Sequence, residues 1–152
     1  MIQSYIEGPV ALTNNTSAVS FTTDCIRSRG ANCCGWLQHS EGSPIYKILE
    51  GGLYEVTFNA NVTSATAGPV ALSLLMDGLP VPGATVIETV VTPGDYSNVA
   101  FTKKIKICCR GDASLSIASI PSVLTGTTLP GTATDTVVPI LQNANITITR
   151  KA

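Results

Sequence analysis

The stretch that decides the fold lies at residues 51–63 and reads Gly-Gly-Leu-Tyr-Glu-Val-Thr-Phe-Asn-Ala-Asn-Val-Thr. The positions between its alternating apolar residues are almost all polar. In an extended chain, successive side chains point to opposite faces. This alternation therefore predicts an antiparallel strand with one face buried and the other facing solvent. The alternating apolar residues are Tyr54, Val56, Phe58, Ala60 and Val62.

The composition of the whole chain favours the same class of structure. Its 152 residues are enough for a single domain with a substantial core. Thr, Val and Ile are abundant, and their β-branched side chains fit pleated sheets better than helices. No stretch shows a convincing helical periodicity. We therefore expect one all-β domain that spans residues 1–152.

Turn residues divide the chain into further expected strands. Asp77-Gly78 is a hairpin signal, because both residues tolerate positive φ. Residues 25–44 are expected to form a long irregular loop, and residues 121–139 a weakly patterned excursion. Eight or more short strands predict a sandwich, a barrel or a jelly roll. The expected strands cover residues 3–6, 18–22, 45–50, 53–63, 70–76, 81–91, 96–108, 115–119 and 143–150.

The charge of the chain is low for a globular domain. Charged residues make up 12% of the sequence, against about 25% in an average domain. Such a surface is typical of a protein partly covered by other subunits, and the alternative is a solvated surface rich in Thr, Ser and Asn. The net charge is −1 and the basic residues form no long run. This distribution argues against nucleic-acid binding.

Targeting and membrane signals are not evident in the sequence. The first ten residues contain Glu7 and no basic residue, unlike the charged start of a signal peptide. No apolar run is long enough to cross a membrane. The sequence thus predicts a protein made in the cytosol but built like an extracellular β module. That combination is typical of phage particles and spore coats.

The residues offer little catalytic chemistry. His39 is the single histidine. By residue type alone, it could act as the base for a nucleophilic Cys33 or Cys34. No third orienting group is evident beside it, and the acidic residues are scattered singly. Arg110-Gly111-Asp112 spells an integrin-recognition tripeptide, but a Gly-Asp turn is also what a hairpin needs. We expect no enzyme activity, no cofactor and no metal.

Five cysteines form an unusual pattern that leaves two main interpretations open. Their spacing matches no common zinc motif. One interpretation is a disulfide between the 25–34 loop and the strand end at 108–109, with the odd cysteine free or bridging chains. The other is free cysteines packed as small hydrophobic residues. The five are Cys25, Cys33, Cys34, Cys108 and Cys109.

Four segments resemble, in their order and spacing, the tumour necrosis factor and complement globular-head superfamily. Residues 52–58 resemble its strand in which glycine and tyrosine precede alternating apolar positions. Residues 70–78 look like its apolar strand that ends in a hairpin, and Gly111-Asp112 looks like its glycine-aspartate turn. Residues 145–149 look like its last, central strand. The resemblance covers residues 45–150.

The chain is also similar to bacterial and phage members of that superfamily, including the heads of collagen-like spore-surface proteins. It differs from those heads because it has no Gly-X-Y stalk. The cysteine-rich segment at 25–34 is also absent from the general pattern.

The resemblance implies a ten-strand jelly roll that packs as a tight homotrimer. Burying a sheet face against two further copies would account for the low charge. Four aromatic residues are then candidates for either the trimer contact or the core. Residues 1–24 or the 25–44 loop are candidate docking elements, because they lie outside the resemblance. The aromatic candidates are Tyr46, Tyr54, Phe58 and Phe101.

We therefore expect a structural virion protein, such as a trimeric capsid decoration protein or head-fibre component assembled in the host cytoplasm. Its expected partners are copies of itself and the major capsid protein or other virion proteins, with no nucleic acid and no membrane. The alternative is a spore- or cell-surface adhesin or receptor-binding module that recognises glycans or proteins.

Overall fold

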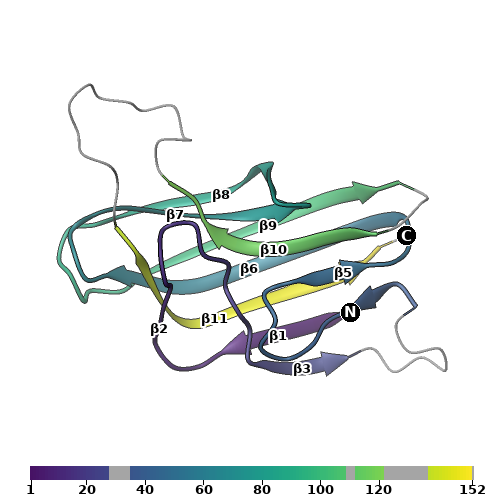
Figure 1. Cartoon of the computed structure of the whole chain (residues 1–152), viewed down its shortest axis with the longest axis horizontal. Coiled ribbons are helices and arrows are strands. Elements are labelled where there is room, and N and C mark those ends of the chain that lie inside the picture. The colour runs from purple at the N-terminus through teal and green to yellow at the C-terminus, as the bar shows by residue number, and fades with distance from the viewer. Residues whose placement is uncertain (28–34, 109–111, 122–136, 152) are drawn as a thin grey trace.

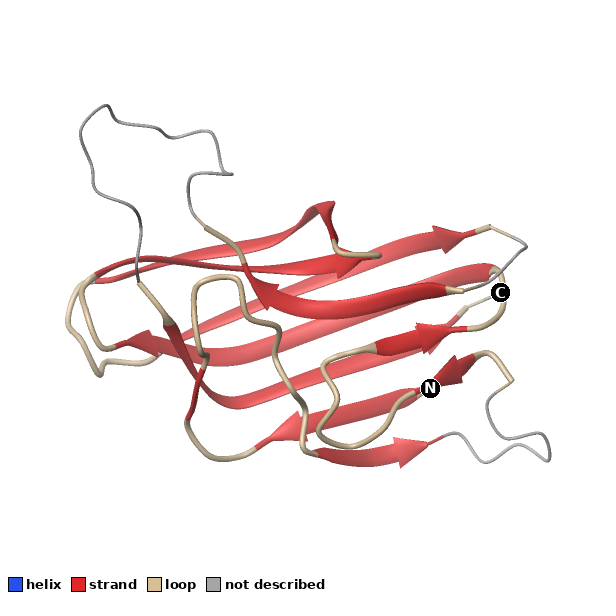
Figure 2. Cartoon of the chain, in the orientation of Figure 1, coloured by secondary structure: helices blue, strands red, loops and turns tan. Residues whose placement is uncertain are grey.

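The computed structural model of the chain describes residues 1–27, 35–108, 112–121 and 137–151, and this part consists of strands and loops (Figures 1 and 2). The strands form two antiparallel sheets that pack as a sandwich. The strands are β1 (Ile2–Ile6), β2 (Val10–Ala11), β3 (Thr23–Arg27), β4 (Leu37–Gln38), β5 (Tyr46–Ile48), β6 (Gly52–Ser64), β7 (Gly68–Met76), β8 (Leu79–Val90), β9 (Ser97–Ile107), β10 (Ala113–Ser119) and β11 (Pro139–Arg150).

The two sheets have different strand orders. The six-stranded sheet runs β3-β1-β11-β6-β9, and β2 pairs with the start of β11. The five-stranded sheet runs β4-β5-β10-β7-β8. Strands far apart in the sequence, such as β1 with β11 and β5 with β10, therefore pair within each sheet, which is the long-range pairing of a jelly roll.

Strand β6 confirms the alternation predicted at residues 51–63. Tyr54, Val56, Phe58, Ala60 and Val62 are all 0% exposed. Neighbouring strands continue the same buried face, because Phe58 lies opposite Ile146 of β11 and Phe101 of β9. The core therefore lies between the sheets, and the polar side chains of β6 face outward.

The hairpin predicted at Asp77-Gly78 is also confirmed. The two residues have φ of 52° and 80°, and Met76 pairs with Leu79 across them. Positive φ at both central positions is the backbone of a type I′ turn, whose twist matches that of the flanking strands. The Asp77 carboxylate also accepts a 2.7 Å hydrogen bond from the backbone N–H of Ser114, which joins the hairpin to β10.

The expected strand at residues 18–22 is wrong. This segment makes an isolated bridge between Ala18 and Ala118, and the strand of this region is β3, at Thr23–Arg27. Val19 and Phe21 gave the segment its strand-like alternation, and both are 0% exposed. Their burial comes from a loop that crosses from one sheet to the other, where Val19 N–H donates to Ile117 O.

Two other boundaries also differ from the expectation. Residues 25–44 contain the end of β3 and the short strand β4 as well as loop. Strand β11 begins at Pro139, four positions before the expected start. The described part of residues 1–44 belongs to the sandwich, because β1 lies between β3 and β11 and its Ile2 and Ile6 are buried.

Candidate functional site

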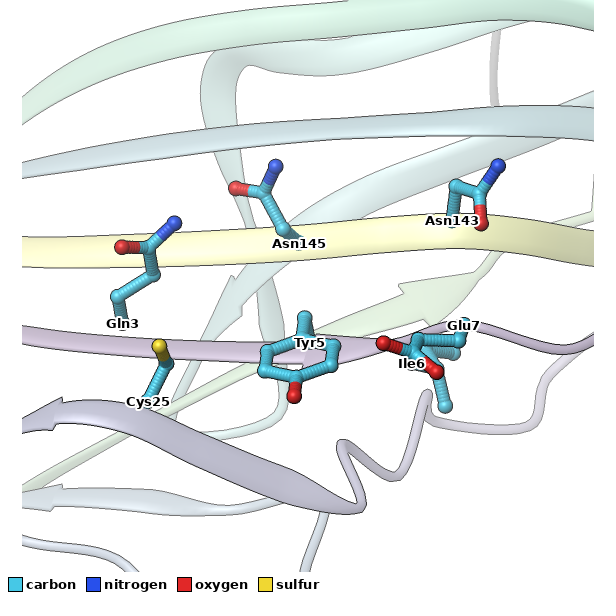
Figure 3. Close-up of a pocket in the computed structure, with 7 residues that line it drawn as sticks. All are labelled: Gln3, Tyr5, Ile6, Glu7, Cys25, Asn143 and Asn145. Atoms are coloured by element: carbon cyan, nitrogen blue, oxygen red, sulfur yellow. The ribbon is translucent and has the colours of Figure 1, made fainter.

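A depression lies on the outer face of the six-stranded sheet, over β3, β1 and β11 (Figure 3). Its volume is about 250 Å³. The side chains around it come from three segments that are far apart in the sequence. They are Gln3, Tyr5, Ile6, Glu7, Cys25, Asn143 and Asn145.

The alternation of β1 turns two of these side chains outward. Ile2, Ser4 and Ile6 are buried, whereas Gln3 and Tyr5 between them are partly exposed. Tyr5 lies opposite Asn145 of β11 in the strand register. An irregularity in the pairing of β1 with β3 falls between Gln3 and Ser4, beside Cys25.

A β-bulge shapes the β11 side of the depression. Between Gln142 and Asn145, β11 advances three residues while its partner β6 advances two, from Asn61 to Asn59. Asn143 in this bulge has a φ of 50°, in the left-handed region that few non-glycine residues adopt. Bulges of this kind re-aim side chains and recur next to functional sites.

The lining of the depression combines apolar surface with polar groups and carries little charge. Glu7 is the one ionisable carboxylate among its described lining residues, which include no Lys, Arg or His. The side-chain amide of Asn145 donates a 2.9 Å hydrogen bond to Asn59 Oδ1, which fixes its orientation. Figure 3 shows the amides of Gln3, Asn143 and Asn145 on the β11 side of the Tyr5 ring, whose hydroxyl points toward β3.

A buried polar cluster lies on the core side of the same strands. His39 Nδ1 lies 2.8 Å from Asp24 Oδ1, and His39 Nε2 lies 3.0 Å from the carbonyl oxygen of Ser43. The hydroxyl of Ser4 donates to the same carboxylate at 2.5 Å. The His39 ring stacks on Tyr46 with 3.9 Å between ring centres.

This cluster has the residue types of a hydrolase but not the accessibility. The side chains of His39 and Asp24 are both 0% exposed, so no substrate reaches them. Both ring nitrogens are already engaged, and Ser4 bonds to Asp24 rather than to the imidazole. The sequence pointed to His39 but missed Asp24 and Ser4, since only the strand pairing brings these positions together.

The cysteines predicted to pair are only partly described. Cys25 and Cys108 are exposed free thiols. Cys33, Cys34 and Cys109 lie outside the described residues, as do Arg110 and Gly111, so the predicted disulfide stays a prediction. Among the residues that the structure describes, no group of three or more His, Cys, Asp or Glu could hold a metal ion.

The aromatic candidates lie mostly in the core. Tyr46, Tyr54 and Phe58 are 0% exposed. Phe101 is partly buried and packs on Phe58 with 5.5 Å between ring centres. The Tyr54 hydroxyl donates a 2.6 Å hydrogen bond to the carbonyl of Glu50.

Large exposed apolar side chains gather instead along the β8 side of the sandwich. Strand β8 is an edge strand of the five-stranded sheet. Leu79 and Ile87 on β8 are 72% and 51% exposed, and Val91 directly after it is 80% exposed. Tyr96, in the turn that leads to β9, is 42% exposed.

Helices able to cross a membrane are absent from the residues that the structure describes.

Comparison with known proteins identifies the fold. No protein-family model matches the sequence, and no curated protein matches it either. Among solved structures, the globular domain of zebrafish complement 1qA protein is similar, with a TM-score of 0.53 over 99% of this chain and 98% of that chain. The sequence identity is 10%, so the likeness concerns the fold alone. The chain has the antiparallel jelly-roll sandwich of complement C1q globular domains.

Proposed function

We propose that this chain is a non-catalytic structural module that assembles as a homotrimer on a virus particle, as a capsid decoration protein or head-fibre component. The C1q-like sandwich supports the structural part, because globular heads of this fold are generally non-catalytic and typically trimeric. The single histidine is buried with Asp24, which also argues against exposed acid–base chemistry. The virion part rests on the resemblance of the sequence to phage members of the superfamily.

We place the contact between copies on the β8 side of the sandwich, because large apolar side chains are exposed there. A three-fold ring requires two different complementary patches on each copy. Leu79 and Val91 lie at the two ends of β8 and Ile87 lies between them, so exposed apolar side chains occur along the length of this sheet edge. Exposed apolar surface next to an unpaired edge strand is a liability in a monomer, and a subunit contact removes it.

Paired substitutions test this assembly. Leu79→Lys combined with Val91→Lys is expected to convert the trimer into a monomer, because it places charges in an apolar contact. Ile45→Lys is the matched control, since Ile45 is 43% exposed and lies just before β5, away from β8. Light scattering reports the mass of each variant. A double variant that remains trimeric would exclude the β8 side as the contact.

The virion placement needs its own experiment. Particles purified from the source culture are examined by mass spectrometry for this chain, and particles that lack it are mixed with the purified protein. We expect the chain in the particles and saturable rebinding to the depleted shell. This design keeps the chain intact, which matters because β1 is an internal strand whose removal would damage the sheet. Absence from purified particles would reject the proposal.

A second candidate function is a surface-exposed binding module on a spore or cell, which recognises glycans or proteins. The depression on the outer sheet face favours it, because it brings an aromatic ring and several side-chain amides together at the surface. Binding of the labelled protein to host cells or spores tests this function, and a lack of binding to either would reject it.

A further inference from the structure

We propose that the depression formed by Gln3, Tyr5, Glu7, Asn143 and Asn145 binds the terminal unit of a neutral saccharide. This inference deepens the second candidate function, the surface-exposed binding module, and names the ligand class and the residues. It does not depend on where the trimer contact lies or on a virion.

The first argument is the position of the Tyr5 ring. The side chain is partly exposed and lies opposite Asn145 in the sheet, and Figure 3 shows three side-chain amides on the β11 side of its ring. A pyranose ring has a face of C–H groups with hydroxyl groups at its rim. An aromatic ring surrounded by hydrogen-bonding groups matches that distribution, because the ring covers the apolar face and the rim groups meet the hydroxyls.

The second argument is the kind of polar group around the ring. Side-chain amides both donate and accept hydrogen bonds, and the Glu7 carboxylate accepts them. Sugar hydroxyls also donate and accept, so each of them can be satisfied by this set. Asn145 is held in place by its bond to Asn59, which directs its carbonyl oxygen before any ligand arrives. Fixing a binding group in advance lowers the entropy lost on binding.

The third argument is the rim formed by the bulge of β11. Leu141 is buried, so strict alternation would turn Asn143 toward the core. The bulge instead leaves Asn143 exposed beside the depression, with a φ of 50°. Asn adopts this left-handed conformation more readily than most residues with a side chain, so it suits the bulge. The bulge thereby places the Asn143 amide where it can contact a ligand in the depression.

Charge and size narrow the ligand further. The described lining carries a carboxylate and no cationic side chain, which disfavours sialylated or sulfated sugars. The volume of about 250 Å³ is below the ~300–1,000 Å³ of pockets that hold drug-sized ligands. A single terminal sugar unit is the expected occupant.

The experiment uses the full chain and a glycan array that carries neutral, sialylated and sulfated oligosaccharides. Saturation-transfer NMR with the strongest neutral oligosaccharide then measures binding to the variants. Tyr5→Ala is expected to weaken binding by about tenfold, and Tyr5→Phe is expected to retain it because the ring remains. Asn143→Gly keeps the backbone conformation but removes the amide, and is expected to weaken binding several-fold. Ile45→Ala, at a residue that is 43% exposed and lies just before β5 in the other sheet, is the control and is expected to leave binding unchanged.

The outcomes separate this inference from the function on which it rests. Unchanged solution mass and thermal midpoint show that each variant is folded, and if Tyr5→Ala is not folded, Asn143→Gly provides the test. If Tyr5→Ala or Asn143→Gly weakens the binding of neutral glycans, the result supports the site. If the protein binds cells but Tyr5→Ala and Asn143→Gly bind equally well, the binding function stands and this site is wrong. Binding to anionic glycans alone, or to no glycan on the array, also overturns it.

Discussion

The carboxylate of Asp24 and the imidazole of His39 form a buried pair that joins β3 to the segment between β4 and β5. Asp24 Oδ1 lies 2.8 Å from His39 Nδ1, and neither side chain is exposed. His39 Nε2 faces the carbonyl of Ser43, which can only accept, so this nitrogen carries a proton. The His39 ring also stacks on Tyr46 with 3.9 Å between ring centres, which adds an aromatic contact to the pair.

Removing one partner of this pair should destabilise the fold strongly. Asp24→Asn removes a buried carboxylate oxygen that is the shared hydrogen-bond partner of His39 and Ser4, and each buried polar group left unsatisfied costs about 1–3 kcal/mol. Urea unfolding followed by circular dichroism measures the change. Asp95→Asn, at an exposed turn position, is the control and should leave the unfolding midpoint in place. Equal urea-unfolding midpoints for the two variants would mean that the pair does not stabilise the fold.

The stability of the protein should fall at alkaline pH because of Tyr46. Burial raises the pKa of Tyr46 well above its ordinary value, the Ser4 hydroxyl lowers it in part, and the charge of Asp24 raises it further. Below about pH 10, the ordinary pKa of tyrosine, Tyr46 is neutral in both the folded and the unfolded chain, so its contribution is fully present. Above that pH the unfolded chain loses this proton first, and the contribution is lost as the pH rises toward the folded pKa.

Absorbance at 295 nm and circular dichroism, both recorded against pH, check this prediction. The absorbance change of Tyr46 should coincide with loss of the sheet signal. Tyr46→Phe should weaken the alkaline loss of stability, and it also removes a buried hydroxyl that lacks a hydrogen-bond partner of good geometry among the described residues. A Tyr46→Phe variant with the same alkaline profile as the parent chain would contradict the prediction.

Phe58→Ala should lower the free energy of unfolding more than most other single substitutions. Phe58 is 0% exposed and contacts Phe101 across the central pairing of β6 with β9. Deleting a buried phenylalanine ring costs about 3–5 kcal/mol, from lost transfer free energy and the cavity left behind. Thr57→Ala, on the outward face one position away, removes only the hydroxyl contact with Thr102 and should cost about 1 kcal/mol. Chemical denaturation distinguishes the two, and similar losses would show that β6 is turned the other way.

Gly78→Ala tests the hairpin between β7 and β8. Gly78 has a φ of 80°, and an added Cβ would meet no atom within 4 Å. The whole effect then comes from the left-handed backbone, which costs about 1–2 kcal/mol for a residue with a side chain. Gly8 has equally open surroundings and no positive φ, so Gly8→Ala should be close to neutral. A neutral Gly78→Ala in thermal unfolding would exclude the type I′ turn.

The sequence predicts this fold best where the pattern is local. The alternation of β6 and the Asp77-Gly78 turn depend on neighbouring residues, and both are confirmed. Strand β3 was missed because its residues carry little apolar alternation, and the early start of β11 was missed because the bulge at Asn143 interrupts the period.

The depression could not be predicted in the same way. The pairing of β1 with β3 and β11 brings Tyr5, Cys25 and Asn145 together. The spacing of residues in the sequence does not predict that pairing. The link between Asp24 and His39 depends on the same tertiary arrangement. Residue type alone therefore indicated His39 but not what it binds.

The solution mass of the intact chain, by light scattering after size exclusion with and without reductant, tests the central claim most directly. The account predicts a mass near three times the chain mass of 15.8 kDa. It predicts the same mass in reductant, because the proposed contact is the apolar β8 side and not a disulfide. A stable monomer in both conditions would contradict the trimeric assembly, and a trimer that reductant dissociates would place the contact at the cysteines instead.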